Sequence, residues 1–238
     1  MTTLLETRDL SKRFGGAHVI NGINFGIEEG EIRCVIGPNG AGKSTFFKLL
    51  TGEYAPSSGS MTFLGTDLAN VLPHVRIQMG MSIKFQIPGV FPELSVREHL
   101  ELGRYRARAH GVTPPALAEL LHEFQLEAEI DVLAANLSHG KKQWLEIGMA
   151  VSLRPKVLFL DEPVAGLSVE ETYTTGELIL GLKQQGLTIM VVEHDMTFVR
   201  QIASRVTVLH GGRLFADGSL EEVLARDDVA DIYLGRQS

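Results

Sequence analysis

The sequence is poor in cysteine and contains no apolar run long enough to cross a bilayer. Cys34 is the only cysteine in 238 residues, so the chain can form no internal disulfide and a reducing compartment is expected. Membrane helices need at least ~18 apolar residues, so a protein of this sequence that works at a membrane would need another chain to span it. Residues 1–6 also lack the basic and apolar regions of a secretory signal.

The chain also lacks an excess of positive charge. Its formal net charge is −7 at pH 7, because 29 acidic residues outnumber 22 basic ones. A balance of that sign argues against nucleic acid as the main partner. Apolar and charged contents of 44% and 21% are ordinary for a globular protein, and the length fits one large α/β domain with room for an inserted subdomain.

The most informative stretch that is present is a glycine-rich loop matching G-x-x-x-x-G-K-[ST]. It consists of Gly37, Pro38, Asn39, Gly40, Ala41, Gly42, Lys43, Ser44 and Thr45. An apolar run at 31–36 predicts a strand before the loop, and the pattern at 45–50 predicts a helix after it, which is the context this motif requires. Main-chain N–H groups and the helix start would hold phosphates. Lys43 would bind the β- and γ-phosphates and the Ser44 hydroxyl would ligate Mg²⁺, so the loop predicts binding of a nucleoside triphosphate.

Two later strand ends carry side chains suited to phosphate chemistry. Asp161 and Glu162 follow the apolar run 157–160, and His194 lies just beyond the apolar run 187–192. Asp161 can hold Mg²⁺ through its water shell, and Glu162 can polarise a water that attacks the γ-phosphate. His194 would stand at the carboxyl edge of a sheet, within reach of that phosphate or water. Adjacent acids and a lone histidine are more often solvated strand ends, so these roles depend on the phosphate loop.

The middle of the chain shows no convincing strand between about residues 94 and 133. A capping-box sequence at 95–98 predicts a helix to about residue 110, and Thr113-Pro114 predicts the start of a second helix with an apolar stripe. We therefore expect one domain, in which a helical subdomain at 87–137 is inserted between core segments 1–86 and 138–238. The pattern after residue 205 predicts two strands with a tight turn and then a terminal helix.

A second helix start suited to anions occurs at Leu137-Ser138-His139-Gly140-Lys141. A serine with a small neighbour at a helix amino terminus forms an anion site, although Ser138 can equally be an ordinary N-cap. One chain has no need of two phosphate-binding helix starts. Two chains facing head to tail would need both, because each would complete the nucleotide site of the other.

Taken in order, these motifs resemble the ATP-binding subunits of ABC transporters over nearly the whole chain. The resemblance implies a P-loop NTPase of the ABC ATPase type, an α/β fold with a mixed sheet core and an inserted α-helical subdomain. It identifies Gln86 with the Q-loop glutamine and Phe14 with the aromatic residue that stacks on adenine. Residues 137–141 resemble the signature L-S-G-G-Q with His139 and Lys141 substituted, and Ser168 stands where many relatives have Asp.

The resemblance also implies roles, cofactors and partners. The catalytic residues would be Lys43, Gln86, Glu162 and His194. The Mg²⁺ ligands would be Ser44, Gln86 and Asp161. ATP would be bound by Phe14 and the 37–45 loop of one chain, with Ser138 and Gly140 of a second ATPase subunit, identical or related. Two integral membrane permease subunits would hold the pair at the cytoplasmic face of the cell membrane. A periplasmic solute-binding protein would be an indirect partner, because it delivers the solute to the permeases.

A narrower resemblance concerns the transported solute. The segments that resemble one ATPase subunit of bacterial urea importers are 84–86, 137–140, 142–149 and 162–167. The tail 232–235 is shared more widely with branched-chain amino acid importers. A soluble ABC ATPase acting on nucleic acid or ribosomes is an alternative, although such proteins usually carry two cassettes or a long coiled coil. A P-loop kinase is another, but it has no use for a second anion site at Ser138.

Overall fold

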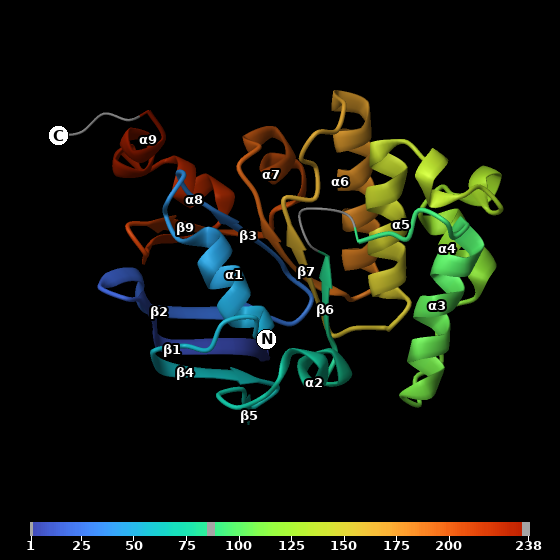
Figure 1. Cartoon of the computed structure of the whole chain (residues 1–238). Helices are drawn as coiled ribbons and strands as arrows, with labels where there is room; N and C mark the ends of the chain where they lie inside the picture. Colours follow the sequence, from blue (N-terminus) through green and yellow to red (C-terminus); the bar gives the residue numbers. More distant parts are fainter. Residues whose placement is uncertain (1, 85–88, 235–238) are drawn as a thin grey trace.

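The computed structural model describes residues 2–84 and 89–234, with the side chains of the last three of these residues left aside (Figure 1). Its smaller sheet is antiparallel, with strand order β2-β1-β4-β5. The strands of this sheet are β1 (Thr3–Phe14), β2 (Ala17–Glu28), β4 (Ser58–Phe63) and β5 (Thr66–Asp67).

The larger sheet has the strand order β10-β9-β3-β8-β7-β6. Its strands are β3 (Ile32–Ile36), β6 (Met81–Lys84), β7 (Val157–Asp161), β8 (Thr188–Val192), β9 (Arg205–His210) and β10 (Arg213–Gly218). All neighbouring pairs are parallel except the β9–β10 hairpin. β3 and β8 are buried along their whole length, which explains why their sequences are continuous apolar runs without alternation.

Helices fill the space on both sides of the larger sheet. They are α1 (Lys43–Thr51), α2 (Pro73–Gln78), α3 (Val96–Ala109), α4 (Leu117–Glu123), α5 (His139–Val151), α6 (Val169–Gln184), α7 (Met196–Ile202), α8 (Leu220–Leu224) and α9 (Asp227–Leu234), with short 3₁₀ turns at Glu127–Glu129 and Ala134–Asn136. None of the helices within 2–84 and 89–234 has the length and apolarity needed to span a membrane.

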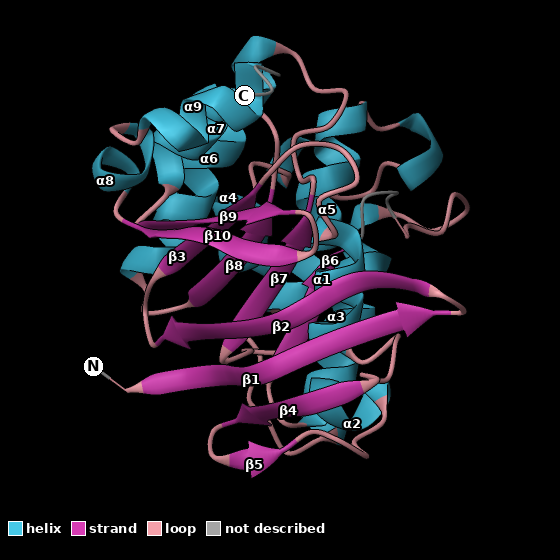
Figure 2. Ribbon diagram, turned by 90° about the vertical axis from the view of Figure 1, so that its left-hand side faces the viewer, coloured by secondary structure: helices cyan, strands magenta, loops and turns pink. Residues whose placement is uncertain are grey.

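The hydrophobic core has two parts, one on each face of the larger sheet. The first joins α1 to the smaller sheet and to one face of the larger sheet, through residues such as Phe46, Phe63 and Phe159. The second joins the opposite face to α5, α6 and α7 and continues into α3 and α4. Figure 2 shows the smaller sheet crossing in front of the larger one, and Figure 1 shows α3 and α4 set to one side as a helical lobe.

Two expectations about the elements need correction. The second helix of the lobe begins at Leu117 and not near Thr113-Pro114, because Pro115 restricts the residue before it to extended backbone. The carboxylate of Glu119 then accepts from the Ala116 N–H at 2.9 Å and fixes the start. The strand β1 was not expected at all, since its polar residues and register shifts hide any alternating pattern.

Candidate nucleotide-binding and catalytic site

The strand order brings the predicted site residues of the core to one edge of the larger sheet. β3, β8, β7 and β6 are adjacent and parallel, so the segments that follow them leave from the same edge. These segments are the phosphate loop after β3, His194 after β8, and Asp161 with Glu162 at the end of β7. Gln86 follows β6 in the sequence but lies outside the described residues.

The phosphate loop has the tight backbone that its glycines were expected to permit. Gly37 and Gly42 have φ values of 151° and 100°. A Cβ at Gly37 would lie 2.2 Å from the Leu209 carbonyl oxygen, and one at Gly42 would lie 2.8 Å from Ile20. Only glycine fits such positions. The loop is therefore pressed against its neighbours, with its outer residues Asn39 and Gly40 exposed.

Lys43 is the buried cation of this loop. Its ammonium donates to the carbonyl oxygens of Gly37 at 2.7 Å and Pro38 at 3.2 Å. Burial lowers the pKa of Lys43, and the charges of Glu162 and Asp161 oppose that change. The electrostatic coupling places the lysine and both acids in one neighbourhood, beside the amino terminus of α1 and the exposed Ser44.

The two acids and the histidine converge as predicted. Glu162 Oε1 lies 3.6 Å from His194 Nδ1, and the Glu162 N–H donates to the Val192 carbonyl at 2.9 Å. Burial, reinforced by the charge of Glu162, raises the pKa of Asp161 to about 6. A base beside a cation-binding acid and a histidine can orient and activate a water molecule.

The residues present fit a magnesium ion. Ser44 and Asp161 supply hydroxyl and carboxylate oxygens, the donor type that Mg²⁺ prefers. Within the described residues no three His, Cys, Asp or Glu side chains cluster as a complete metal site. Mg²⁺ normally takes only one or two protein ligands beside phosphates and water, so Asp161 and Ser44 are the side chains that would hold it.

Glu193 is a buried acid that the sequence did not single out. It is 1% exposed, and one carboxylate oxygen accepts from the N–H groups of His194 at 2.9 Å and Asp195 at 3.2 Å. Its other oxygen accepts from the Val164 N–H at 3.4 Å. Glu193 therefore joins the His194 backbone to the loop after Glu162. Its position directly after the apolar strand β8 was the only available signal.

Phe14 ends β1 with 43% of its surface exposed, as an adenine-stacking residue requires. Its ring packs edge to face against Tyr54, with centroids 5.2 Å apart. Lys12 Nζ lies 5.0 Å from the Phe14 centroid and 5.7 Å from the Tyr54 centroid. The sequence did not point to Tyr54, whose ring forms an aromatic pair with that of Phe14.

Ser138 and Gly140 lie at the start of α5, next to the loop that follows Glu162. Ser138 caps α5 by accepting from the Lys141 N–H at 3.3 Å, so its N-cap role is confirmed. A Cβ at Gly140 would lie 2.5 Å from Glu171 Oε1 on α6. This helix start is thus in close contact with α6 and is separate in the fold from the phosphate loop.

The unusual residues of this helix start make contacts within the chain. His139 Nε2 lies 3.1 Å from the Ala165 carbonyl oxygen, which fits donation from the ring. Lys141 forms an ion pair with Glu129 of the lobe, so its charge is directed at the lobe. Ser168 caps α6 through a reciprocal pair of hydrogen bonds with Glu171. Each departure from the family pattern therefore has a structural use.

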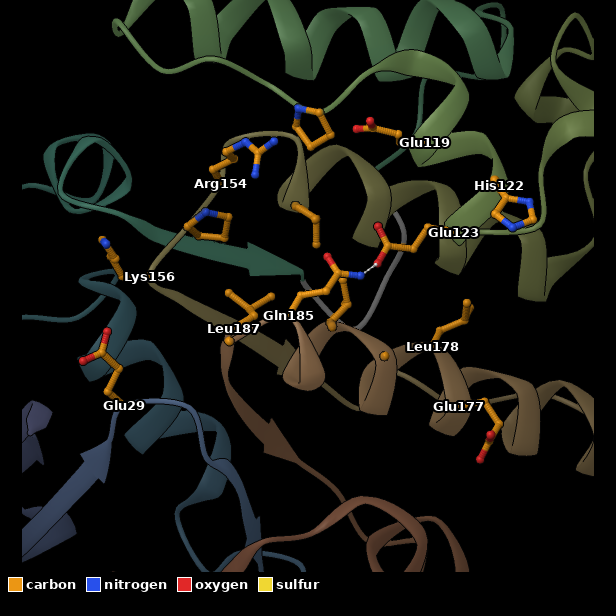
Figure 3. Close-up of a pocket in the computed structure, with 16 residues that line it drawn as sticks. Glu29, Glu119, His122, Glu123, Arg154, Lys156, Glu177, Leu178, Gln185 and Leu187 are labelled. Atoms are coloured by element: carbon orange, nitrogen blue, oxygen red, sulfur yellow. Dashed lines mark hydrogen bonds between the residues drawn. The ribbon is translucent and has the colours of Figure 1, made fainter. Parts of the chain in front are cut away.

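A cavity of about 770 Å³ lies away from these residues. Glu29, Lys156 and Leu187 line it from just before β3, β7 and β8, so it lies toward the amino ends of the parallel strands. Figure 3 shows Gln185 and Glu123 meeting across it, joined by a hydrogen bond of 2.5 Å between α4 and the end of α6. The cavity therefore lies between the helical lobe and the core, at the edge of the larger sheet opposite the phosphate loop.

Comparison with known proteins agrees with this geometry. A family model described as ABC transporter matches residues 20–165. The chain is 32% identical over 248 residues to a probable branched-chain amino acid transport ATP-binding protein, LivG, of Archaeoglobus fulgidus, covering 98% of this chain and 96% of that protein. It is 33% identical over 249 residues to the corresponding protein BraF of Pseudomonas aeruginosa, covering 98% of each. An ATP-binding cassette of an ABC transporter, solved in its ADP conformation, superposes with a TM-score of 0.87 at 28% identity, over 99% of this chain and all of that one.

Proposed function

The chain belongs to the ABC transporter family as an ATP-binding and ATP-hydrolysing subunit, and we propose that it drives uptake of branched-chain amino acids or urea. The observation that carries the proposal is the division of phosphate-binding parts. Lys43, Asp161 and Glu162 meet at one sheet edge, whereas Ser138 and Gly140 lie apart from them at the start of α5, where we propose a second anion site. Two separate half-sites suit a nucleotide bound between two chains.

In the proposed mechanism each chain supplies most of one ATP site. Phe14 stacks on adenine and the 37–45 loop holds the phosphates. Ser44, Asp161 and Gln86 are the residues that would hold Mg²⁺. Glu162 polarises the attacking water, and His194 lies beside it and contacts the γ-phosphate. Mg²⁺ supplies charge neutralisation at the phosphates when it is bound.

A second ATPase subunit completes the site with its Ser138 and Gly140. ATP favours the closed pair because it binds that state more tightly, and hydrolysis removes the preference. The helical lobe then moves with the nucleotide state and contacts one of two permease subunits at the cytoplasmic face of the cell membrane. A periplasmic solute-binding protein delivers the solute to those permeases.

The catalytic part is tested with Glu162→Gln, which keeps the side-chain shape but removes the base. Turnover should fall on the order of 10²–10⁴-fold, while ATP binding persists. Glu170→Gln makes the same chemical change at an exposed position on α6 and should keep normal turnover. Unchanged ATPase activity in Glu162→Gln would refute the role given to this residue.

The solute is tested with the solute-binding protein encoded beside this chain. The names of the relatives above favour branched-chain amino acids, whereas residues 84–86 and 162–167 favour urea. Calorimetry with leucine and with urea separates the two. Binding of neither, with tight binding of a sugar such as ribose, would reject both solutes and leave the ATPase assignment intact.

A further inference from the structure

Glu193 is a buried acid at the end of a central strand, and the proposed mechanism gives it no role. It directly follows β8, which lies between β3 and β7 in the larger sheet (Figure 2). Only 1% of its surface is exposed. Burying a carboxylate is costly unless hydrogen bonds compensate it, and an apolar residue in this place would carry no such cost. The contacts of Glu193 therefore indicate the use of an acid at this position.

Both oxygens of this carboxylate accept hydrogen bonds from backbone N–H groups. Oε2 accepts from His194 at 2.9 Å and from Asp195 at 3.2 Å, and Oε1 accepts from Val164 at 3.4 Å. Burial raises the pKa of Glu193, and these three hydrogen bonds oppose the rise. An ionised carboxylate is acceptor-only, so it can hold N–H groups at both of its ends. The side chain thus joins the turn that carries His194 to the loop that follows Glu162.

The backbone at the end of β8 adds two further connections. The Glu193 N–H donates at 3.2 Å to the carbonyl of Val35, in the strand that leads into the phosphate loop. The preceding residue, Val192, accepts from the Glu162 N–H at 2.9 Å. Residues 192 and 193 therefore contact the strand before the phosphate loop, the backbone of Glu162 and the turn of His194.

Glu193 also lies beside the ring of His194. His194 Nδ1 is 3.9 Å from Glu193 Oε2 and 3.6 Å from Glu162 Oε1, so this side of the ring faces two carboxylates. The His194 side chain is 61% exposed, and an exposed side chain can adopt several staggered rotamers. Its position therefore depends on the two acids and on the backbone N–H that Glu193 holds.

We propose that Glu193 is a positioning residue that holds His194 beside the Glu162 carboxylate, because its own carboxylate accepts hydrogen bonds from both loops at once. The inference rests on the proposed function, in which His194 and Glu162 act at the γ-phosphate and the attacking water. Glu193 is itself buried, so it acts through these two residues. Small displacements of reacting groups lower rates strongly, so loss of this connection should slow hydrolysis more than it weakens ATP binding.

The test uses Glu193→Gln in the full chain, which keeps the shape of the side chain but places an NH₂ group at one end. An amide accepts hydrogen bonds at one end only, so this variant can hold one of the two loops and not both. The kcat should fall at least about tenfold, with KM for ATP within about threefold of wild type. Wild-type kcat in folded Glu193→Gln would overturn the inference.

Asp195→Asn is the matched control, because it makes the same chemical change two residues away. The Asp195 carboxylate caps α7 by accepting from the N–H groups of Thr197 and Phe198, and asparagine is an equally good N-cap. The three hydrogen bonds of Glu193 stay in place. The kcat of Asp195→Asn should remain within about twofold of wild type. An equal loss in both variants would contradict a specific role for Glu193.

A comparison with His194→Ala separates positioning from a merely structural role. If Glu193 acts by holding His194, Glu193→Gln should lower kcat by less than about twofold once His194 is alanine. Radiolabelled ATP keeps these slow variants measurable. Losses that multiply in the double variant would contradict the inference. Wild-type activity in His194→Ala would count against the proposed function as well, whereas wild-type activity in Glu193→Gln counts against the inference alone.

Glu193→Asp is the second variant, for the case in which Glu193→Gln does not fold. It keeps the charge and both acceptor oxygens, but its side chain is one methylene shorter and cannot reach both loops. The kcat of folded Glu193→Asp should fall at least about threefold, with KM for ATP near that of wild type. An unchanged kcat in this variant would overturn the inference.

Discussion

At the scale of single residues, the backbone of Glu162 is the least ordinary feature of the site. Its φ is +44°, in the left-handed region that non-glycine residues rarely occupy. Such strain persists only where neighbours fix it, and it gathers at functional sites. Here the hydrogen bond to Val192 holds the backbone and Pro163 follows directly. With the backbone held in this way, the Glu162 carboxylate lies beside His194, with Oε1 3.6 Å from Nδ1.

Cys34 gives a residue-scale prediction about chemistry. Burial, the main cause, raises the pKa of this thiol, and the charge of Glu193 adds to the rise. Only the thiolate reacts readily, so native protein should resist iodoacetamide. Labelling followed by intact mass measurement should show modification only after unfolding in guanidinium, with Cys34→Ala as the unlabelled control. Rapid modification of the native protein would contradict the buried position in β3.

At the scale of elements, the contact between α4 and the end of α6 should control opening of the lobe. Gln185 and Glu123 meet at the surface, so removing their bond with Gln185→Ala should hardly change global stability. Hydrogen exchange in α4 should accelerate while the core strands keep their protection. Gln184→Ala, one residue earlier, is the control. Equal exchange in α4 for wild type and Gln185→Ala would show that this bond does not restrain the lobe.

The helices and strands differ in how clearly the amino-acid sequence predicts them. β3, β7 and β8 were predictable because strands buried on both faces are apolar throughout. The start of α3 was predictable because Ser95 and Glu98 satisfy the first N–H groups reciprocally. The strand β1 was not predictable, because its pairing with β2 overrode the weak local preference of its residues. The start of α4 was not predictable either, because two consecutive prolines delay the helix to Leu117.

At the scale of the whole molecule, the sequence predicted a nucleotide site but not the connections within it. Lys43, Asp161 and His194 follow recognisable strand patterns, and strand order then brings them together. Glu193, in contrast, directly follows the apolar strand β8, and its contact with the Val164 N–H joins segments that are distant in the sequence. Likewise, the contacts of His139 and Lys141 depend on Ala165 and Glu129, which only the folded chain brings near.

The central claim is that the phosphate loop is half of a site completed by Ser138 of a second chain. Sedimentation of Glu162→Gln with and without ATP tests it most directly. The account predicts a monomer without ATP and a dimer with ATP. Adding Ser138→Asp should abolish the dimer, because a carboxylate there repels the γ-phosphate of the partner. A dimer that forms without ATP, or one that Ser138→Asp leaves intact, would contradict the account.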